Sequence, residues 1–305
     1  MPFLIVGIVG HGAMRSFGKS LLPSSIMVTS ALINIGLTPT LLHGWFIFPR
    51  LQIEGVALAT SIARVFNLVV TLIFLGTNFK IFSQVRFNLS EMMENWKKVL
   101  RIGLPASIAN VSDSIGISIA TKLLSTYGAS AVAAFGVATR IESLAILPIL
   151  ALGTSYSAFA GQNYGASKTQ RIKKGFHLGI GLSLINAIAI FTAAKLLGTT
   201  ITNTLASDEK VAQIALDYIV IVSVSLLGFG IYKNTAAILN GVDRAKTALG
   251  ITAFRKFLLY VPLIWIAKEY FDLVYVFWAV AVTNLISGII AYFVFSRWLK
   301  TTSKK

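Results

Sequence analysis

Asp113 is the residue of this sequence best suited to ion chemistry. It stands in the middle of an apolar run at 99–126, where polar residues recur at a spacing of three or four and share one helical face. That face consists of Ser107, Asn110, Ser114, Ser118 and Thr121. A carboxylate there can exchange a proton, or it can ligate Na⁺ through oxygen atoms together with Asn110 and Ser114. We predict a cation-coupling site at these three residues, and a structural carboxylate bonded to a neighbouring helix is the alternative.

Four further residues are candidates for the lining of a substrate cavity: Arg140, Tyr218, Tyr232 and Lys233. Lys233 can place a positive charge near Asp113, or extend its ammonium group to the polar end of its own helix. Arg140 can meet an anionic substrate, or form an ion pair between helices. Tyr218 and Tyr232 can stack on flat cations, although a stripe of aromatic and small residues is equally typical of close helix packing.

Three residues are predicted to shape a helix. Pro148 removes one backbone hydrogen bond, so we expect it to kink its helix into a gating element. Gln162 and Asn163 precede Gly165 at the end of the same run, and we expect them to cap and turn that helix.

These candidates lie in long apolar runs, whose length indicates helices that cross a membrane. A helix needs about 20 apolar residues to cross a bilayer, and eight such runs follow a shorter one at 2–13. They are 24–48, 56–76, 99–126, 132–160, 175–197, 211–232, 249–267 and 273–295. None shows the period of two that is typical of a strand. The sequence therefore predicts an all-α, polytopic membrane helix bundle of about nine helices.

The composition excludes several function classes. Of the 305 residues, 55% are hydrophobic and only 12% are charged, whereas about 25% are charged in soluble domains. The absence of cysteine excludes a disulfide framework and a cysteine-ligated zinc site. The three histidines have no partner at ligand spacing, and no phosphate-binding glycine loop is present. We therefore expect no enzyme activity, no ATP use, no metal site and no cofactor other than a coupling Na⁺ or H⁺.

The net charge of +16 predicts an orientation in the membrane. When the loops are taken in alternation, most of the 27 lysines and arginines fall on one side. The positive-inside rule makes that side cytoplasmic and places the C-terminus there. The cytoplasmic set is Arg15, Lys19, Lys80, Arg86, Lys97, Lys98, Arg101, Lys168, Arg171, Lys173, Lys174, Arg244, Lys246, Arg255, Lys256, Arg297, Lys300, Lys304 and Lys305. Basic patches for nucleic acid would not alternate with membrane-length runs, so we expect no nucleic-acid partner.

A polar stretch and an internal repeat predict the domain organisation. Residues 78–98 are expected to form a cytoplasmic linker with a helix start at Ser90, although a merely long loop is the alternative. A shift of 225 residues superposes 15–23 on 240–248, two polar segments between apolar runs. The repeat suggests two parallel lobes related by an axis along the membrane normal. We predict a partial N-terminal lobe at 1–77 and a six-helix lobe at 99–305.

Several motifs occur in a fixed order along the chain. They are RSFGKS at 15–20, NIGLTP at 34–39, GVALAT at 55–60, RIGLP at 101–105, VAAFGVATRI at 132–141, GQNYGA at 161–166 and NGVDRAK at 240–246. In this order and spacing the chain resembles the multidrug and toxic compound extrusion (MATE) family of the multidrug/oligosaccharidyl-lipid/polysaccharide flippase superfamily. The resemblance covers helices four to twelve of a twelve-helix transporter, so the first three helices are not matched and helix four is short.

The resemblance implies secondary active efflux of drugs or metabolites, coupled to entry of H⁺ or Na⁺ by alternating access between two helical lobes. It implies a bacterial or archaeal inner membrane, with the lipid bilayer and small, cationic amphiphilic substrates as partners. The position of Asp113 matches that of an intramembrane glutamate which certain family members use for cation coupling. The family's companion carboxylate in the tenth helix is not seen, and Thr38 stands where the family commonly has aspartate. We expect this truncated chain to need a further N-terminal lobe segment for activity.

Two alternatives accompany this interpretation. One is a lipid-linked oligosaccharide flippase of the same superfamily, which would be expected to show a more cationic cavity. The other is an inactive fragment. A membrane-embedded lipid-modifying enzyme would need a His/Asp or paired-carboxylate constellation at a membrane surface, and the sequence shows none.

Overall fold

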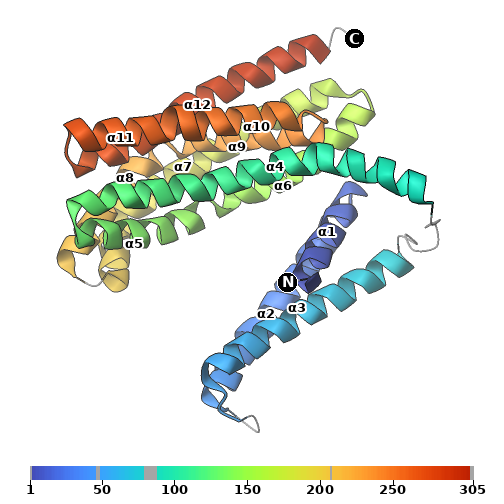
Figure 1. The fold of residues 1–305 in the computed structure, drawn as a ribbon, viewed down its shortest axis with the longest axis horizontal. Coiled ribbons are helices and arrows are strands. Elements are labelled where there is room, and N and C mark those ends of the chain that lie inside the picture. Colours follow the sequence, from blue (N-terminus) through green and yellow to red (C-terminus); the bar gives the residue numbers. More distant parts are fainter. Residues whose placement is uncertain (1, 46–48, 79–87, 207, 303–305) are drawn as a thin grey trace. The chain divides into compact units, whose positions relative to one another are not determined.

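The computed structural model describes residues 2–45, 49–78, 88–206 and 208–302, and the regular structure in these ranges is entirely helical. The predicted all-α fold is therefore confirmed. The helices are α1 (Pro2–Ser16), α2 (Leu21–His43), α3 (Gln52–Thr77), α4 (Leu89–Leu124), the short 3₁₀ turn η2 (Ser125–Tyr127), α5 (Ala129–Ala145), α6 (Leu147–Gly165), α7 (Thr169–Leu205), α8 (Glu209–Ser223), α9 (Leu226–Gly241), α10 (Ala245–Ala253), the π-helical segment η3 (Phe254–Tyr260), α11 (Val261–Tyr270) and α12 (Leu273–Thr302). Figure 1 shows their arrangement.

The chain divides into two compact units, an N-terminal unit at Met1–Met92 and a C-terminal unit at Met93–Lys305. This division falls inside the predicted linker at 78–98. The second half of that stretch is helical, because α4 already begins at Leu89, where the Asn88 side chain accepts a hydrogen bond from the Ser90 amide at 3.1 Å. Residues 79–87, with Lys80 and Arg86, lie outside the described ranges, as do Lys304 and Lys305.

Several helices are long and apolar enough to cross a membrane. Within the described ranges there are five, namely α2, α3, α7, the continuous segment from α10 to α11, and α12. The number rises to seven if the bent pairs α5–α6 and α8–α9 each form one span. The run at 99–126 was predicted as a further span, but α4 is not among these helices because polar residues occupy a whole face of it.

Two runs predicted as single helices are broken. The run at 132–160 forms α5 and α6, which meet at an angle of 46°. Pro148 lies in the first turn of α6, where its missing N–H has no helical partner to lose. The run at 211–232 forms α8 and α9, which meet at 59°. No proline marks this second break, and it was not predicted from the sequence.

The break between α8 and α9 is held by a polar side chain from α12. Asn284 Nδ2 donates a hydrogen bond to Ser225 Oγ at 2.9 Å, and Ser225 Oγ donates to the Val222 carbonyl oxygen at 2.7 Å. Helices α9 and α12 approach closely because Gly228 of α9 and Gly288 of α12 face each other. A Cβ atom on Gly288 would lie 2.6 Å from the Gly228 Cα atom. Small residues at helix crossings are the usual way in which membrane helices pack. The shape of this span therefore depends on a contact with a distant helix.

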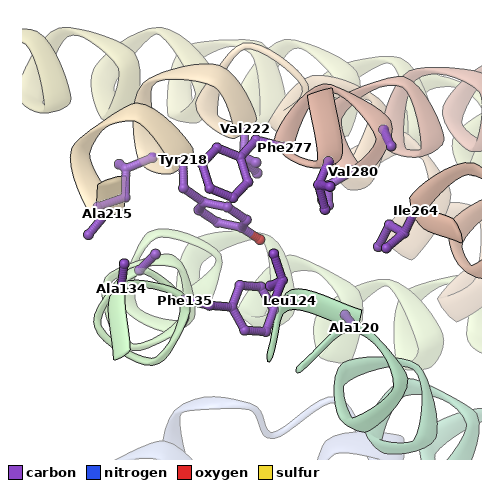
Figure 2. Packing of buried hydrophobic residues seen from close by; sticks show 14 of the residues in the cluster. Ala120, Leu124, Ala134, Phe135, Ala215, Tyr218, Val222, Ile264, Phe277 and Val280 are labelled. Carbon is purple, nitrogen blue, oxygen red and sulfur yellow. The ribbon is translucent and has the colours of Figure 1, made fainter. Parts of the chain in front are cut away.

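Apolar clusters fix the helices of the C-terminal unit. In the cluster shown in Figure 2, Tyr218 of α8 packs edge-on against Phe135 of α5 and Phe277 of α12, with ring centroids 5.7 and 5.2 Å apart. In a second cluster Phe176 of α7 stacks on Phe295 of α12 at a centroid distance of 3.9 Å. These clusters hold α5, α7, α8 and α12 around the polar interior described below.

Small and polar residues join the helices of the N-terminal unit. His11 of α1 is buried, with its Nε2 atom 3.0 Å from Thr71 Oγ1 of α3. Asn34 of α2 donates a hydrogen bond to Thr60 Oγ1 of α3 at 3.3 Å. Asn34 and Thr60 belong to two of the motifs in the sequence, and these motifs therefore form a contact between helices.

The two segments that the sequence repeat pairs end their helices in the same way, as the turns after α2 and α6 also do. The turn after α1 and the turn after α9 have the same hydrogen-bond pattern at a shift of 225 residues. In each, one residue adopts the left-handed region and the next amide donates to the carbonyl five residues before it, as in a Schellman motif. The equivalent residues are Gly18 (φ 78°) and Asp243 (φ 59°), followed by Lys19 bonded to Met14 at 3.2 Å and Arg244 bonded to Leu239 at 2.8 Å.

The contact between α9 and α12 predicts the effect of one added methyl group. In Gly228→Ala the new Cβ atom would collide with the Asn284 carbonyl oxygen. We expect a loss of about 1–3 kcal/mol in stability, as for other overpacked interiors, measured as a lower unfolding temperature by tryptophan fluorescence in detergent. Gly181→Ala on α7 is the matched control, because nothing lies within 4 Å of its added Cβ atom. Equal unfolding temperatures for both variants would contradict the close approach.

Candidate functional site

Asp113 of α4 lies among three basic side chains. Its Oδ2 atom accepts a hydrogen bond from Lys233 Nζ of α9 at 2.9 Å. Its Oδ1 atom lies 3.5 Å from Lys256 Nζ and 3.8 Å from Arg255 Nη1, both on η3. We refer to these four residues as the charge cluster. Three cations thus surround one carboxylate inside the C-terminal unit.

The location of Arg255 and Lys256 is the main difference between the structure and the sequence-based prediction. Both were assigned to a cytoplasmic loop, but they lie within the helical segment from α10 to α11. Their side chains are only 6% and 5% exposed, compared with 28% for Asp113 and 22% for Lys233. A pair of adjacent charges is expensive in an apolar interior unless partners are present, and the sequence alone does not show those partners.

Polar and aromatic groups on other helices supply the partners of these cations. Arg255 Nη2 donates a hydrogen bond to Asn284 Oδ1 of α12 at 2.7 Å. The guanidinium group also lies 5.0 Å from the Tyr232 ring centroid, and Lys256 Nζ lies 4.1 Å from that of Tyr260. Contacts of this kind between cations and aromatic rings are attractive, more so when water is excluded. The interior is therefore adapted to hold positive charge.

Local backbone features bring Lys256 to Asp113. The segment η3 is π-helical, and single π-helical turns are frequent at functional sites. The Lys256 side chain passes over Gly116 of α4, and a Cβ atom there would lie 2.8 Å from Lys256 Nζ. Gly116 follows Asp113 by almost one helical turn, so the absence of its side chain lets the lysine reach the carboxylate.

A cavity of about 280 Å³ lies beside the charge cluster. It is lined by residues of α4, α6, α9 and α10, and four of the predicted site residues are among them: Asn110, Asp113, Tyr232 and Lys233. Thr154, Ser157, Asn240 and Thr252 add polar groups to the lining. Cavities with a few convergent polar groups in a mostly apolar wall are typical of small-molecule sites.

The remaining predicted coupling and cavity residues lie elsewhere. Ser114 lies on α4 and Arg140 on α5, and both are outside the lining of this cavity. Tyr218 is buried in the apolar cluster of Figure 2, and its hydroxyl group donates a hydrogen bond to Glu142 Oε2 at 2.8 Å. Glu142 was not among the predicted site residues. An acidic residue within an apolar run was the available signal.

Gln162 and Asn163 take part in ending α6. The Gln162 carbonyl oxygen accepts a hydrogen bond from the Ala166 amide at 3.1 Å, and that of Asn163 accepts one from the Lys168 amide at 2.8 Å. The Asn163 side chain donates back to the Phe159 carbonyl oxygen at 2.8 Å. Neither residue lines the cavity beside Asp113.

The arrangement bears on which ions can bind. No group of three or more histidines, aspartates and glutamates with the geometry of a metal site is found in the described ranges. Both oxygens of Asp113 face basic groups, so a Na⁺ ion bound there would be repelled by three positive charges. The same three charges favour the ionised carboxylate, so uptake of a proton would also have to displace their ion pairs.

These features define a polytopic helical membrane protein with a charged interior cavity. The chain belongs to the MatE family, whose model matches residues 105–266, more than half of its length. The matched range contains all four residues of the charge cluster.

Known relatives extend the similarity along nearly the whole chain. It is 29% identical to an FAD transporter of Shewanella oneidensis over 97% of this chain and 66% of that protein. It is 29% identical to the probable multidrug resistance protein YoeA of Bacillus subtilis, over 88% of this chain and 59% of that protein. It is 24% identical to the multidrug export protein MepA of Staphylococcus haemolyticus, over 96% of this chain and 64% of that protein. The chain thus spans about two thirds or less of the length of these relatives.

Solved structures show the same fold. The MATE transporter VcmN of Vibrio cholerae, in a mutant form, superposes with a TM-score of 0.88 at 23% identity, covering 98% of this chain and 68% of that one. A MOP superfamily transporter of Pyrococcus furiosus gives a TM-score of 0.88 at 22% identity, covering 98% and 67%.

Removal of the carboxylate from the charge cluster should be costly. Asp113→Ala leaves three cations without their shared anion, and breaking a buried pair in this way costs about 3 kcal/mol. The measurement is the unfolding temperature of the purified protein in detergent. Glu94→Ala is the control on the same helix, because its ion pair with Lys98 is 66–68% exposed and such pairs contribute at most about 1 kcal/mol. An equal loss in both variants would show that the cluster is not a coupled unit.

Proposed function

We propose that this protein is a secondary active transporter that exports small molecules in exchange for H⁺ or Na⁺. The observation that carries the proposal is the charge cluster with its adjoining cavity, which lies inside apolar helices and within the range matched by the MatE family. Ionisable groups inside membrane spans usually serve substrate or ion pathways. The multidrug export and resistance proteins among the relatives support efflux as the direction of transport.

Alternating access is the mechanism we infer for this transport. Rocking of helical lobes around a fixed midplane site is general among transporters built from internal repeats, and the sequence similarity at a shift of 225 residues suggests such a repeat here. The bend between α5 and α6 at Pro148 supplies a site for helix movement beside the cavity. Leu150 and Gly153, which follow the proline on α6, line that cavity.

The inner membrane, with the C-terminus in the cytoplasm, is the location we propose. Arg255 and Lys256 no longer count among the loop residues, because they are buried. The other basic residues of the predicted cytoplasmic set fall on one side when the apolar runs of the sequence are taken as spans in alternation. The positive-inside rule concerns short loops near span ends, so the predicted orientation does not depend on Arg255 and Lys256.

Asp113 is the coupling residue in this proposal, with Asn110 beside it in the cavity lining. Either coupling ion has to compete with Lys233, Arg255 and Lys256 for this carboxylate, because both of its oxygens face basic groups. The cationic amphiphiles expected as substrates stay a prediction, and the surplus of positive charge weighs against their binding directly beside Asp113.

Export of a flavin nucleotide is the second candidate function. It is supported by the likeness to the FAD transporter of Shewanella oneidensis, which extends over 97% of this chain. The lipid-linked oligosaccharide flippase is not favoured, because the relatives described above are multidrug and FAD transporters.

Efflux from bacteria that lack their main multidrug pumps tests the proposal. Cells expressing the chain joined to the N-terminal lobe segment that it is expected to need should accumulate less ethidium than vector controls, and a protonophore should abolish the difference if H⁺ is the coupling ion. Asp113→Asn should abolish efflux, because the variant cannot exchange a proton at this site. Asp272→Asn, at an exposed position before α12, is the control and should retain it.

Two outcomes would contradict parts of the proposal. Unchanged efflux in Asp113→Asn at equal expression would exclude this residue as the coupling site. Efflux that persists without any H⁺ or Na⁺ gradient would exclude antiport.

A further inference from the structure

The charge cluster contains more positive than negative charge. Lys233, Arg255 and Lys256 contribute three cations, and Asp113 is the carboxylate that pairs with them. Glu142, the other acid of this interior, is engaged by the Tyr218 hydroxyl group. Even when both acids are ionised, the basic groups exceed them by one. An uncompensated charge in an apolar interior is unfavourable, so the cluster is suited to receive a further anion.

A buried donor on Arg255 is also without a partner. Its Nε atom makes no hydrogen bond within the described ranges, although its side chain is only 6% exposed. Unsatisfied buried donors are rare in folded proteins and usually have a functional reason. The guanidinium group therefore retains bonding capacity beyond Asp113 and Asn284.

The cluster is reachable from the cavity. Lys233 and Asp113 line it directly, whereas Arg255 and Lys256 are buried, are not part of the lining, and contact Asp113. An anionic group in the cavity could take the hydrogen bond that Lys233 now donates to Asp113, and charge-assisted bonds of this kind are the strong ones in proteins. The Asn110 amide in the same lining can donate a further hydrogen bond.

We propose that the charge cluster binds a phosphate or carboxylate group of a soluble organic anion, with Asp113 as its internal counter-ion. This inference rests on the proposed function, since it takes the cavity to be part of the transport path. The empty site pairs Lys233 with Asp113, and the loaded site pairs Lys233 with the substrate. At about 280 Å³ the cavity accommodates the anionic end of a larger molecule, because drug-sized sites occupy about 300–1,000 Å³.

The experiment compares two probes that differ by one phosphate group. Flavin mononucleotide and riboflavin share a fluorescent ring system, and their binding to the purified full chain in zwitterionic detergent is measured by fluorescence quenching. Wild-type protein should bind flavin mononucleotide at least about tenfold more tightly, as expected for one hydrogen bond to a charged group. Equal affinity for the two probes, or no binding of either, would overturn the proposal.

Variants assign the binding to the cluster. Lys233→Gln should lose most of the preference for flavin mononucleotide, and Lys233→Arg should retain it. Lys210→Gln, which removes an exposed lysine at the start of α8, is the control with the same charge change. Asp113→Asn should bind the phosphate probe more tightly than wild type, because it removes the competing carboxylate. A merely structural role of Asp113 would give weaker binding in that variant.

Two further measurements separate the possible failures. Loss of flavin mononucleotide binding on addition of phosphatidylglycerol to the micelles would overturn the assignment to a soluble anion and give the site to a lipid headgroup. Ethidium efflux by a protein that fails the probe comparison would remove the anion site while the proposed transport function stands.

Discussion

Three cationic side chains share one carboxylate inside a bundle of apolar helices, and much of the surrounding structure is arranged to satisfy them. Two unit charges 4 Å apart interact by about 4 kcal/mol at an effective dielectric constant of 20, while removing each ion from water costs several kcal/mol. Asp113 alone does not offset that cost for Lys233, Arg255 and Lys256. The aromatic rings beside the cations and the Asn284 amide contribute further stabilisation. Residues of α4, α9, η3 and α12 together stabilise the buried charges.

The charge cluster is linked to the shape of the spans through Asn284. Its side-chain oxygen accepts from Arg255 and its side-chain nitrogen donates to Ser225, at the break between α8 and α9. Gly228 and Gly288 permit the close approach that makes both bonds possible. One amide therefore connects the buried guanidinium group to the 59° bend of a span. A change in the charge state or occupancy of the cluster would act on the bend through this amide.

Sequence reasoning predicted the elements that depend on local pattern. Apolar run lengths indicated the helices, whereas the repeat inferred from the residues around Gly18 and Asp243 stays a prediction. The spacing of Asp113 within its run identified the centre of the charge cluster. Arg255 and Lys256 were misplaced, because adjacent charges in one run indicate a loop unless partners from other helices are known. The break at Ser225 was missed for the same reason: the residue that holds it lies 59 positions away.

The π-helical turn of η3 has an evolutionary consequence. A π turn accommodates one residue more than the α-helical ladder, so deletion of a single residue between 254 and 260 lets the helix return to regular winding. Each residue of an α-helix advances the azimuth by about 100°, and the wider π turn absorbs nearly that amount, so α10 and α11 would keep their relative orientation after the deletion. Only the residues of the turn itself, Arg255 and Lys256 among them, would shift. A one-codon change in length can thus alter the charged interior while the two flanking helices stay in register.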